Sequence, residues 1–173
     1  MEDGSGLLHG SAPVIHGNAW AWSHGYLPGT MTALPAGNRN GFKAGGYDLD
    51  VKTFPSAPVK HTVRNCLSVA NKAAGFYTNH HPDSGYFYNN TSYHNNPEFN
   101  MLGLSRSRAE ITVGVYRNNI AVGTKLLSHS SGADSASNSW NLSSAASDRD
   151  FQSVAGTGLD GPRQAAGSRP RLP

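Results

Sequence analysis

The chain has little of several residue types, and each shortage narrows the class of protein. Its 173 residues include one cysteine, Cys66, so an internal disulfide framework is excluded. Charged residues make up only 14% of the chain. No apolar run approaches the roughly 18 to 20 residues that a membrane span needs, and the N-terminus has no basic stretch followed by an apolar segment. The sequence therefore predicts one domain, with no signal peptide of its own and no membrane partner.

Glycine and asparagine are abundant instead, with 20 and 15 residues. This balance favours turn-rich β structure over helices, which prefer Ala, Leu, Glu and Lys. The net charge of +3 favours a polyanionic partner. The basic residues are scattered apart from Arg163, Arg169 and Arg171, so nucleic acid is disfavoured as a partner and an acidic polysaccharide fits.

Four segments share one pattern, which is Asn, any residue, then an apolar or Thr position, a small residue, a large residue, any residue and usually a polar residue. They begin at Asn18, Asn65, Asn89 and Asn118, which are separated by 47, 24 and 29 residues. Such spacing is typical of a solenoid whose coils contain roughly two dozen residues plus loops. We expect the first interval to hold two coils.

The middle of each segment alternates large, small, large, which is the period of a short strand. Stacked in parallel, these strands would bury their large residues in a continuous tube. The flanking asparagines would line up, and their amides would bond one another from coil to coil. The strand triplets are Trp20–Trp22, Leu67–Val69, Thr91–Tyr93 and Ile120–Val122.

A second recurring element has the form Gly-Phe followed by a variable residue. It occurs at residues 41–43 and 75–77, with looser equivalents at 4–6 and 98–100. If these are successive strands of one sheet, Gly6, Lys43 and Tyr77 project from the same face. After about residue 125 both patterns end. We therefore expect coils over residues 1–125 and a Ser, Gly and Pro-rich tail over 126–173, packed on the solenoid or partly disordered.

These segments resemble polysaccharide lyase family 9, a pectate-lyase-like group with hallmarks close to G-N-G-F-K-L-G-G, H-x-V-x-N-C-x-A-x-x-N, G-F-x-x-N and N-N-T-A-Y. This chain reads GNRNGFKAGG (37–46), HTVRNCLSVAN (61–71), GFYTN (75–79) and NNTSYHNN (89–96). The end segment from SWNL onward is also similar. The resemblance implies an all-β fold, a right-handed parallel β-helix with a loop-rich C-terminal tail.

The resemblance further implies a secreted, monomeric, calcium-dependent pectate (polygalacturonate) lyase that cleaves α-1,4-galacturonan by β-elimination. Lys43 aligns with the lysine that abstracts the C5 proton of the substrate. That proton is α to a carboxylate and only weakly acidic, so a cation on the carboxylate must offset the developing negative charge. A G-x-x-x-x-G-K-[ST] phosphate loop is absent around Lys43, which disfavours a nucleotide site.

The sequence contains only some of the calcium ligands that the resemblance implies. The acidic D-D-G-x-D motif of the family aligns with the start of this chain, where Glu2 and Asp3 are the predicted metal ligands and Gly6 replaces the third carboxylate. Calcium takes six to eight oxygen ligands, so two carboxylates predict weak binding. Because the chain begins inside this motif, we expect a fragment that lacks the first coils.

Four residues are candidates for binding the substrate. Arg39 and Arg64 could pair bidentately with uronate carboxylates, and Tyr77 and Asn79 lie in the Gly-Phe segment. Each is also compatible with an ordinary surface role, as is His80. Two other functions stay open. The chain could be a degenerate β-helix that binds acidic polysaccharide without cleaving it, or a lyase on another uronic acid glycan.

Overall fold

The computed structural model describes residues 13–27, 29–45, 60–81, 85–105, 109–112, 114–151 and 154. Three parallel sheets contain most of its strands. The five-stranded sheet contains β1 (Ile15–Gly17), β4 (His61–Arg64), β7 (Gly85–Tyr88), β12 (Val115–Arg117) and β15 (Asp134–Ala136). The tryptophan sheet contains β2 (Trp20–Trp22), β5 (Leu67–Val69), β8 (Thr91–Tyr93) and β13 (Ile120–Val122). The lysine sheet contains β3 (Phe42–Lys43), β6 (Phe76–Tyr77), β9 (Phe99–Asn100) and β14 (Leu127–Ser128).

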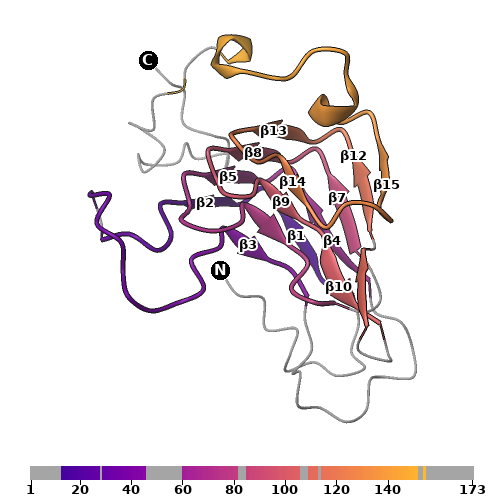
Figure 1. Cartoon of the computed structure of the whole chain (residues 1–173), viewed down its shortest axis with the longest axis horizontal. Helices are drawn as coiled ribbons and strands as arrows, with labels where there is room; N and C mark the ends of the chain where they lie inside the picture. Colours follow the sequence, from indigo (N-terminus) through magenta and orange to yellow (C-terminus); the bar gives the residue numbers. More distant parts are fainter. Residues whose placement is uncertain are drawn as a thin grey trace.

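The chain visits the three sheets in a fixed order, so each circuit adds one coil to a stack (Figure 1). Every neighbouring pair within the three sheets is parallel. An antiparallel hairpin of β10 (Leu102–Leu104) and β11 (Glu110–Thr112) lies between the third circuit and the fourth. The prediction of an all-β parallel helix is therefore confirmed. The helices in the described part, η2 (Ser139–Asn141) and η3 (Asp148–Asp150), have neither the length nor the apolar character needed to cross a membrane.

Stacked aromatic rings fill the interior. Phe42, Phe76 and Phe99 are in register on the lysine sheet, with ring centroids 5.0 and 4.9 Å apart and nearly parallel planes. On the five-stranded sheet the rings of Phe87 and Tyr116 stack at 4.9 Å. All five are almost completely buried. Because successive side chains of a strand point to opposite faces, an inward phenylalanine directs the next residue of each lysine-sheet strand outward.

The predicted orientation of the tryptophan sheet is wrong. Its small middle residues face the interior and are buried, whereas Trp22 and Ile120 are 41% and 39% exposed. The small inward residues are Ala21, Ser68, Ser92 and Ala121.

The reason is that the interior is very narrow beside this sheet. A Cβ added to Gly41 would lie 2.2 Å from the Ser68 hydroxyl, and one added to Gly75 would lie 2.1 Å from the Ser92 hydroxyl. The backbone of the segment leading into the lysine sheet thus fills the space that a large inward side chain would need. Ser68 and Ser92 also donate hydrogen bonds to the carbonyls of Gly75 and Glu98 at 3.0 Å, which satisfies their buried hydroxyls.

The predicted asparagine ladders exist, but one is shifted by a residue. The first residue of each repeat adopts the left-handed conformation, with φ of 53° to 55°. The ladder is formed by the residue that follows it. The side-chain oxygen of Asn90 accepts from the Cys66 backbone, that of Asn119 from the Asn90 backbone, and that of Asn138 from the Asn119 backbone, at 2.9–3.0 Å. Asparagine tolerates the left-handed region well, so the first position serves the turn instead.

A second ladder follows the tryptophan sheet and uses the last position of each repeat, as predicted. The backbone N–H of His24 donates to the Asn71 side chain at 2.9 Å, and that of Asn71 donates to Asn95 at 2.8 Å. The ladder ends on a carboxylate from the same coil as Asn95, because the Asn95 N–H donates to Glu98 Oε1 at 2.8 Å.

Two predicted boundaries differ from the structure. β1 pairs directly with β4 and β2 with β5, so the first interval holds one coil and a long connection instead of two coils. Coil stacking also continues past residue 125, because β14 pairs with β9 and β15 pairs with β12. The predicted coils are recognised by their asparagine segments. The last coil has an asparagine segment of a different sequence, around Asn138, so the repeat pattern does not detect it.

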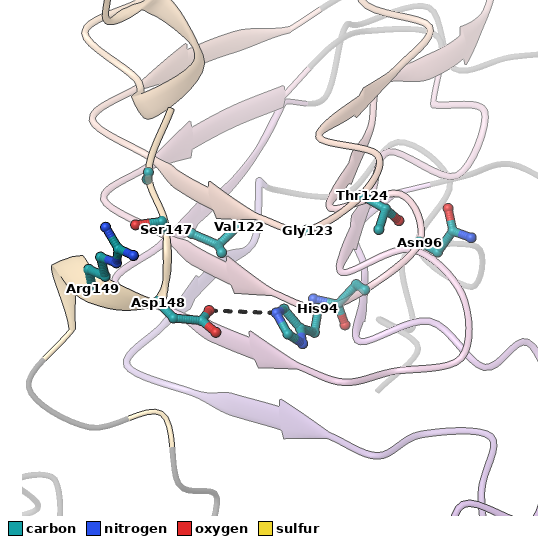
Figure 2. A pocket seen from close by; sticks show the side chains of 10 residues that line it. His94, Asn96, Val122, Gly123, Thr124, Ser147, Asp148 and Arg149 are labelled. Atoms are coloured by element: carbon teal, nitrogen blue, oxygen red, sulfur yellow. Dashed lines mark ion pairs between the residues drawn. The ribbon is translucent and has the colours of Figure 1, made fainter. Parts of the chain in front are cut away.

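The described tail after β15 passes over the β13 end of the stack and returns along the tryptophan sheet (Figure 1). Tyr93 donates a hydrogen bond to Asp148 at 2.8 Å, and its ring meets that of Phe151 edge-on at 5.6 Å. His94 lies 3.7 Å from the same Asp148 carboxylate (Figure 2). A pocket lies between the tail and the sheet, and its lining includes His94, Val122 and Arg149.

Candidate functional site

Lys43 lies on the outer face of the lysine sheet, where it is half-buried. It is in register with Tyr77, and Tyr77 with Asn100, on successive coils. Adjacent strands are about 4.8 Å apart, so these side chains form one row across the sheet. The prediction that Lys43 and Tyr77 share a face is confirmed. Gly6, the third member of that prediction, lies outside the described residues.

Tyr77 is paired with a histidine from the turn that follows its own strand. Its hydroxyl lies 3.0 Å from Nδ1 and 3.2 Å from Nε2 of His80. Burial raises the pKa of Tyr77 to about 12, and the negative charge of Glu110 acts in the same direction. Tyr77 is therefore a neutral phenol over the ordinary pH range, and it can donate a proton or a hydrogen bond.

His80 is the meeting point of several charged groups. Burial lowers its pKa, the charges of Lys43 and His129 lower it further, and Glu110 opposes them. The residue has a left-handed backbone with φ of 61°, and its backbone N–H donates to Leu102 O at 3.1 Å. This bond joins the turn to the β10–β11 hairpin, which contains Glu110. Tyr77 and His80 are thus in contact, Lys43 lies on the strand beside Tyr77, and Glu110 is near enough for its charge to affect the pKa of His80.

Sequence reasoning missed Glu110 and His129 as members of this group. No motif contains them, and each comes from a different coil from Lys43. The register that brings them together depends on the hairpin and on the pairing of β14 with β9, neither of which has a sequence signal.

The other predicted substrate residues lie in different places. Asn79 donates from Nδ2 to the carbonyl of Gly45 at 2.8 Å, so it anchors the chain just after Lys43. Arg39 is half-buried before β3 and donates from Nη2 to Pro35 O at 2.9 Å. Arg64 is exposed on the five-stranded sheet. The structure therefore brings Tyr77 and Asn79 close to Lys43, but it puts Arg64 on another sheet.

The predicted metal ligands Glu2 and Asp3 lie outside the described residues. Among the residues that are described, no group of three or more His, Cys, Asp and Glu side chains could hold a metal ion. Glu110 alone does not provide the six to eight oxygens that calcium takes. The described part of the site therefore does not fit a calcium ion by itself, and the metal site stays a prediction.

The chain matches the family model described as the Pel9A-like, right-handed β-helix region over residues 1–145. Pectate lyase L of Dickeya dadantii (strain 3937) is 31% identical over 153 residues, which cover 88% of this chain and 33% of that protein. Pectate lyase L of Thermoclostridium stercorarium is 35% identical over 98 residues, or 57% of this chain and 7% of that protein.

A solved structure of a rhamnogalacturonan lyase superposes with a TM-score of 0.81 at 29% identity, over 93% of this chain and 41% of that one. This chain spans about a third of the length of the Dickeya relatives that it matches. The relatives are polysaccharide lyases by name. The family match covers most of the chain and agrees with the parallel stack of coils. The chain belongs to the Pel9A-like right-handed β-helix family.

Proposed function

We propose that this chain is part of the catalytic region of a lyase that cleaves an acidic, uronate-containing polysaccharide by β-elimination, with Lys43 as the base. The observation that carries the proposal is the row of Lys43 and Tyr77 on the outer face of the lysine sheet, beside His80. Pectate is the leading substrate, since the curated relatives are pectate lyases.

The elimination needs one base and one proton donor. Neutral Lys43 takes the C5 proton, the C5–H electron pair becomes the C4=C5 double bond, and the C4–O4 bond breaks. The leaving O4 then takes a proton. A positioned base and a positioned acid each contribute about 10²–10⁴-fold in rate. The C5 proton is α to a carboxylate and only weakly acidic, so its removal by an amine needs a cation that offsets the negative charge developing on that carboxylate.

Tyr77 is the proton donor that fits this geometry. It is next to Lys43 on the adjacent strand, and its raised pKa keeps the phenol protonated under alkaline conditions that favour a neutral lysine. His80 positions the hydroxyl through their hydrogen bond. The resulting phenolate regains its proton from solvent.

Calcium dependence is part of the proposal and depends on Glu2 and Asp3. When bound, the ion would neutralise the substrate carboxylate and so favour proton loss at C5. Cleavage in the presence of calcium that stops on addition of a chelator and returns with excess calcium would support this role. Activity unaffected by the chelator would contradict it.

The test of the main proposal is the ultraviolet absorbance of the unsaturated product formed from polygalacturonate. Wild-type protein should produce it, Lys43→Ala should be slower by about 10²–10⁴-fold, and the exposed Lys125→Ala control should match wild type. Binding of the polymer without any product from wild type would contradict the proposal and support a non-cleaving binder.

A second substrate is favoured by the similarity to a rhamnogalacturonan lyase. The same base and acid would serve there, because loops beside the groove, and not the fold, set specificity. Comparing initial rates on polygalacturonate and on rhamnogalacturonan decides between the two. Secretion is also proposed from the pectate lyase relatives, and it would be checked by assaying culture supernatant against cell lysate.

A further inference from the structure

The outer face of the five-stranded sheet bears an aromatic and basic surface that the proposed reaction does not use. β4, β7 and β12 lie side by side in this sheet. Their outward residues form two rows across the strands. One row contains Arg64, Tyr88 and Arg117, in register. The other contains Tyr86 between Thr62 and Val115. Tyr88 is thus flanked by an arginine on each neighbouring strand, about 4.8 Å away.

The two tyrosines present a continuous aromatic surface. The rings of Tyr86 and Tyr88 stack with centroids 5.8 Å apart and planes 21° apart. The Lys60 ammonium lies 5.8 Å from the centre of the Tyr86 ring, within cation–π range. Both rings are only half-buried. Their outward surfaces are available to a ligand that stacks on aromatic groups.

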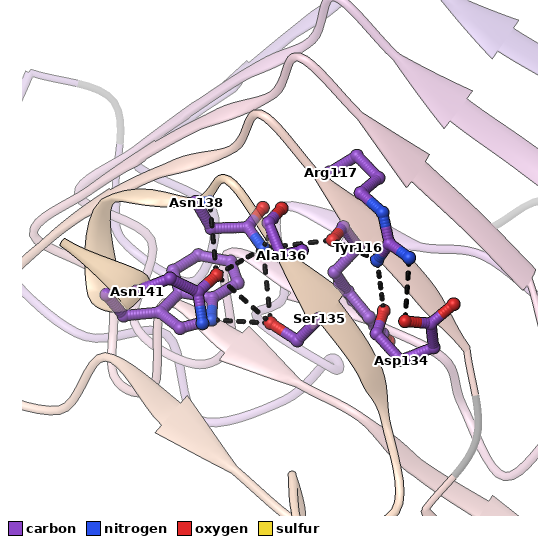
Figure 3. A network of polar contacts seen from close by, with 8 residues as sticks. Tyr116, Arg117, Asp134, Ser135, Ala136, Asn138 and Asn141 are labelled. Atoms are coloured by element: carbon purple, nitrogen blue, oxygen red, sulfur yellow. Dashed lines mark hydrogen bonds and ion pairs between the residues drawn. The ribbon is translucent and has the colours of Figure 1, made fainter.

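Arg117 is held rigidly beside Tyr88. Its Nη2 lies 2.6 Å from Asp134 Oδ1, and its Nη1 donates to the carbonyls of Tyr116 and Asp134 at 3.0 and 2.8 Å (Figure 3). Asp134 therefore fixes this guanidinium and offsets its charge. Arg64 is exposed and, within the described part of the chain, forms no ion pair.

We propose that Lys60, Arg64, Tyr86, Tyr88 and Arg117 form a second docking surface for acidic polysaccharide, the tyrosine–arginine face, separate from the lysine sheet. Sugar rings stack on aromatic side chains through their C–H faces, and guanidinium and ammonium groups pair with uronate carboxylates. The coil repeat presents these groups at a regular spacing, which suits a polymer that is itself a repeat. This surface rests on the proposed function only for the class of polymer that it binds.

Charge favours a polysaccharide over nucleic acid as the occupant. A nucleic-acid surface typically neutralises about 6–10 phosphates, whereas this face has three cations, and Asp134 offsets one of them. A moderately charged glycan with stacking surfaces matches such a mixture better. Docking here would keep a long polymer attached while another stretch of it occupies the lysine sheet, and this raises the effective concentration at Lys43.

Binding measured in a Lys43→Ala background tests the inference without cleavage of the ligand. Polygalacturonate affinity is compared between the parent, Lys60→Gln/Arg64→Gln, and the control Lys125→Gln/Arg149→Gln, which removes one exposed lysine and one exposed arginine elsewhere. The first double variant should bind about tenfold more weakly at low salt, and the control should bind like the parent. Because the readout is binding alone, a lyase assay that fails leaves this result intact.

Tyr88→Leu provides an independent arm, because it removes stacking without changing charge. It should weaken binding at low and at high salt, whereas the loss in the charge variant should shrink as salt rises. Equal losses in both double variants, or unchanged binding in Lys60→Gln/Arg64→Gln, would overturn the proposal. So would equally tight binding of single-stranded DNA, or a concentration-dependent dimer that the double variant abolishes in size-exclusion chromatography.

Discussion

The buried carboxyl of Glu98 should make the stability of the fold depend on pH in the direction opposite to acid denaturation. Glu98 is completely buried at the end of the second asparagine ladder. Burial raises its pKa from 4.5 to about 7, although hydrogen bonds from Ser92 and Asn95 favour the ionised form and oppose the shift. The carboxylate is therefore costly to ionise in the folded chain and easy to ionise in the unfolded chain.

The sign follows from proton binding. Below pH 4.5 both states are protonated, so Glu98 has no effect on the free energy of unfolding. Between 4.5 and about 7 the folded state retains the proton that the unfolded state has lost, and stability falls as pH rises. Above that range the loss is complete. A shift of this size corresponds to about 3 kcal/mol, or several degrees in Tm for a chain of this length.

Urea unfolding at a series of pH values between about 4 and 8 measures the effect, with Glu98→Gln removing the titrating group. The difference in unfolding free energy between wild type and Glu98→Gln should change by about 3 kcal/mol across that range, with wild type losing stability relative to the variant as pH rises. Leu142→Ala, which alters an exposed residue and no titratable group, is the control, and its difference from wild type should stay constant across the range. A constant difference between wild type and Glu98→Gln would refute the reasoning.

Three further substitutions test the ladder, the core and the site. Asn119→Ala should cost about 2–4 kcal/mol, because it leaves the Asn90 N–H and the Phe87 carbonyl without their side-chain partner. Asn118→Gly next to it, at φ 55°, should change the unfolding free energy in urea little. Tyr116→Phe should be neutral or stabilising by about 1 kcal/mol, since the buried hydroxyl has no partner among the described residues; a large loss in Tm would contradict this. Tyr77→Phe should lower kcat by about 10²-fold with little change in KM, and an unchanged kcat would exclude it as the proton donor.

Three of the four strands of the lysine sheet could be predicted from the sequence, whereas β14, which lies after residue 125, could not. A glycine, an inward phenylalanine and an outward residue recur at residues 41–43, 75–77 and 98–100, with glutamate in place of the glycine in the last of these. Strand alternation then gives the direction of Lys43 without any tertiary information. The structure confirms the looser equivalent at residues 98–100, since Phe99 is in register with Phe76 and stacks on it.

The orientation of the tryptophan sheet could not be predicted from the sequence. The alternation of large and small residues assigns them to two opposite faces, but it does not show which face is buried. The usual rule puts large apolar residues inside. Here the nearby backbone at Gly41 and Gly75 leaves room only for Ala or Ser, which is a property of the cross-section and not of the strand. The same limit recurs at Gly123, where a Cβ would lie 1.9 Å from Glu98 Oε1.

The narrow cross-section also explains why function divides among the faces of this fold. Ring stacks, small residues, Val63 and Met101 fill the described part of the interior, so we expect chemistry to use outward side chains. Each outward position recurs on the next coil about 4.8 Å away. A substitution at such a position therefore changes one member of a row of side chains on the surface, and not the lining of a pocket. Lys43 and Tyr77 form such a row on one sheet, and Arg64, Tyr88 and Arg117 form another. A polymeric substrate can engage both rows at once, which a small molecule cannot, and the two rows are therefore expected to act on the same chain.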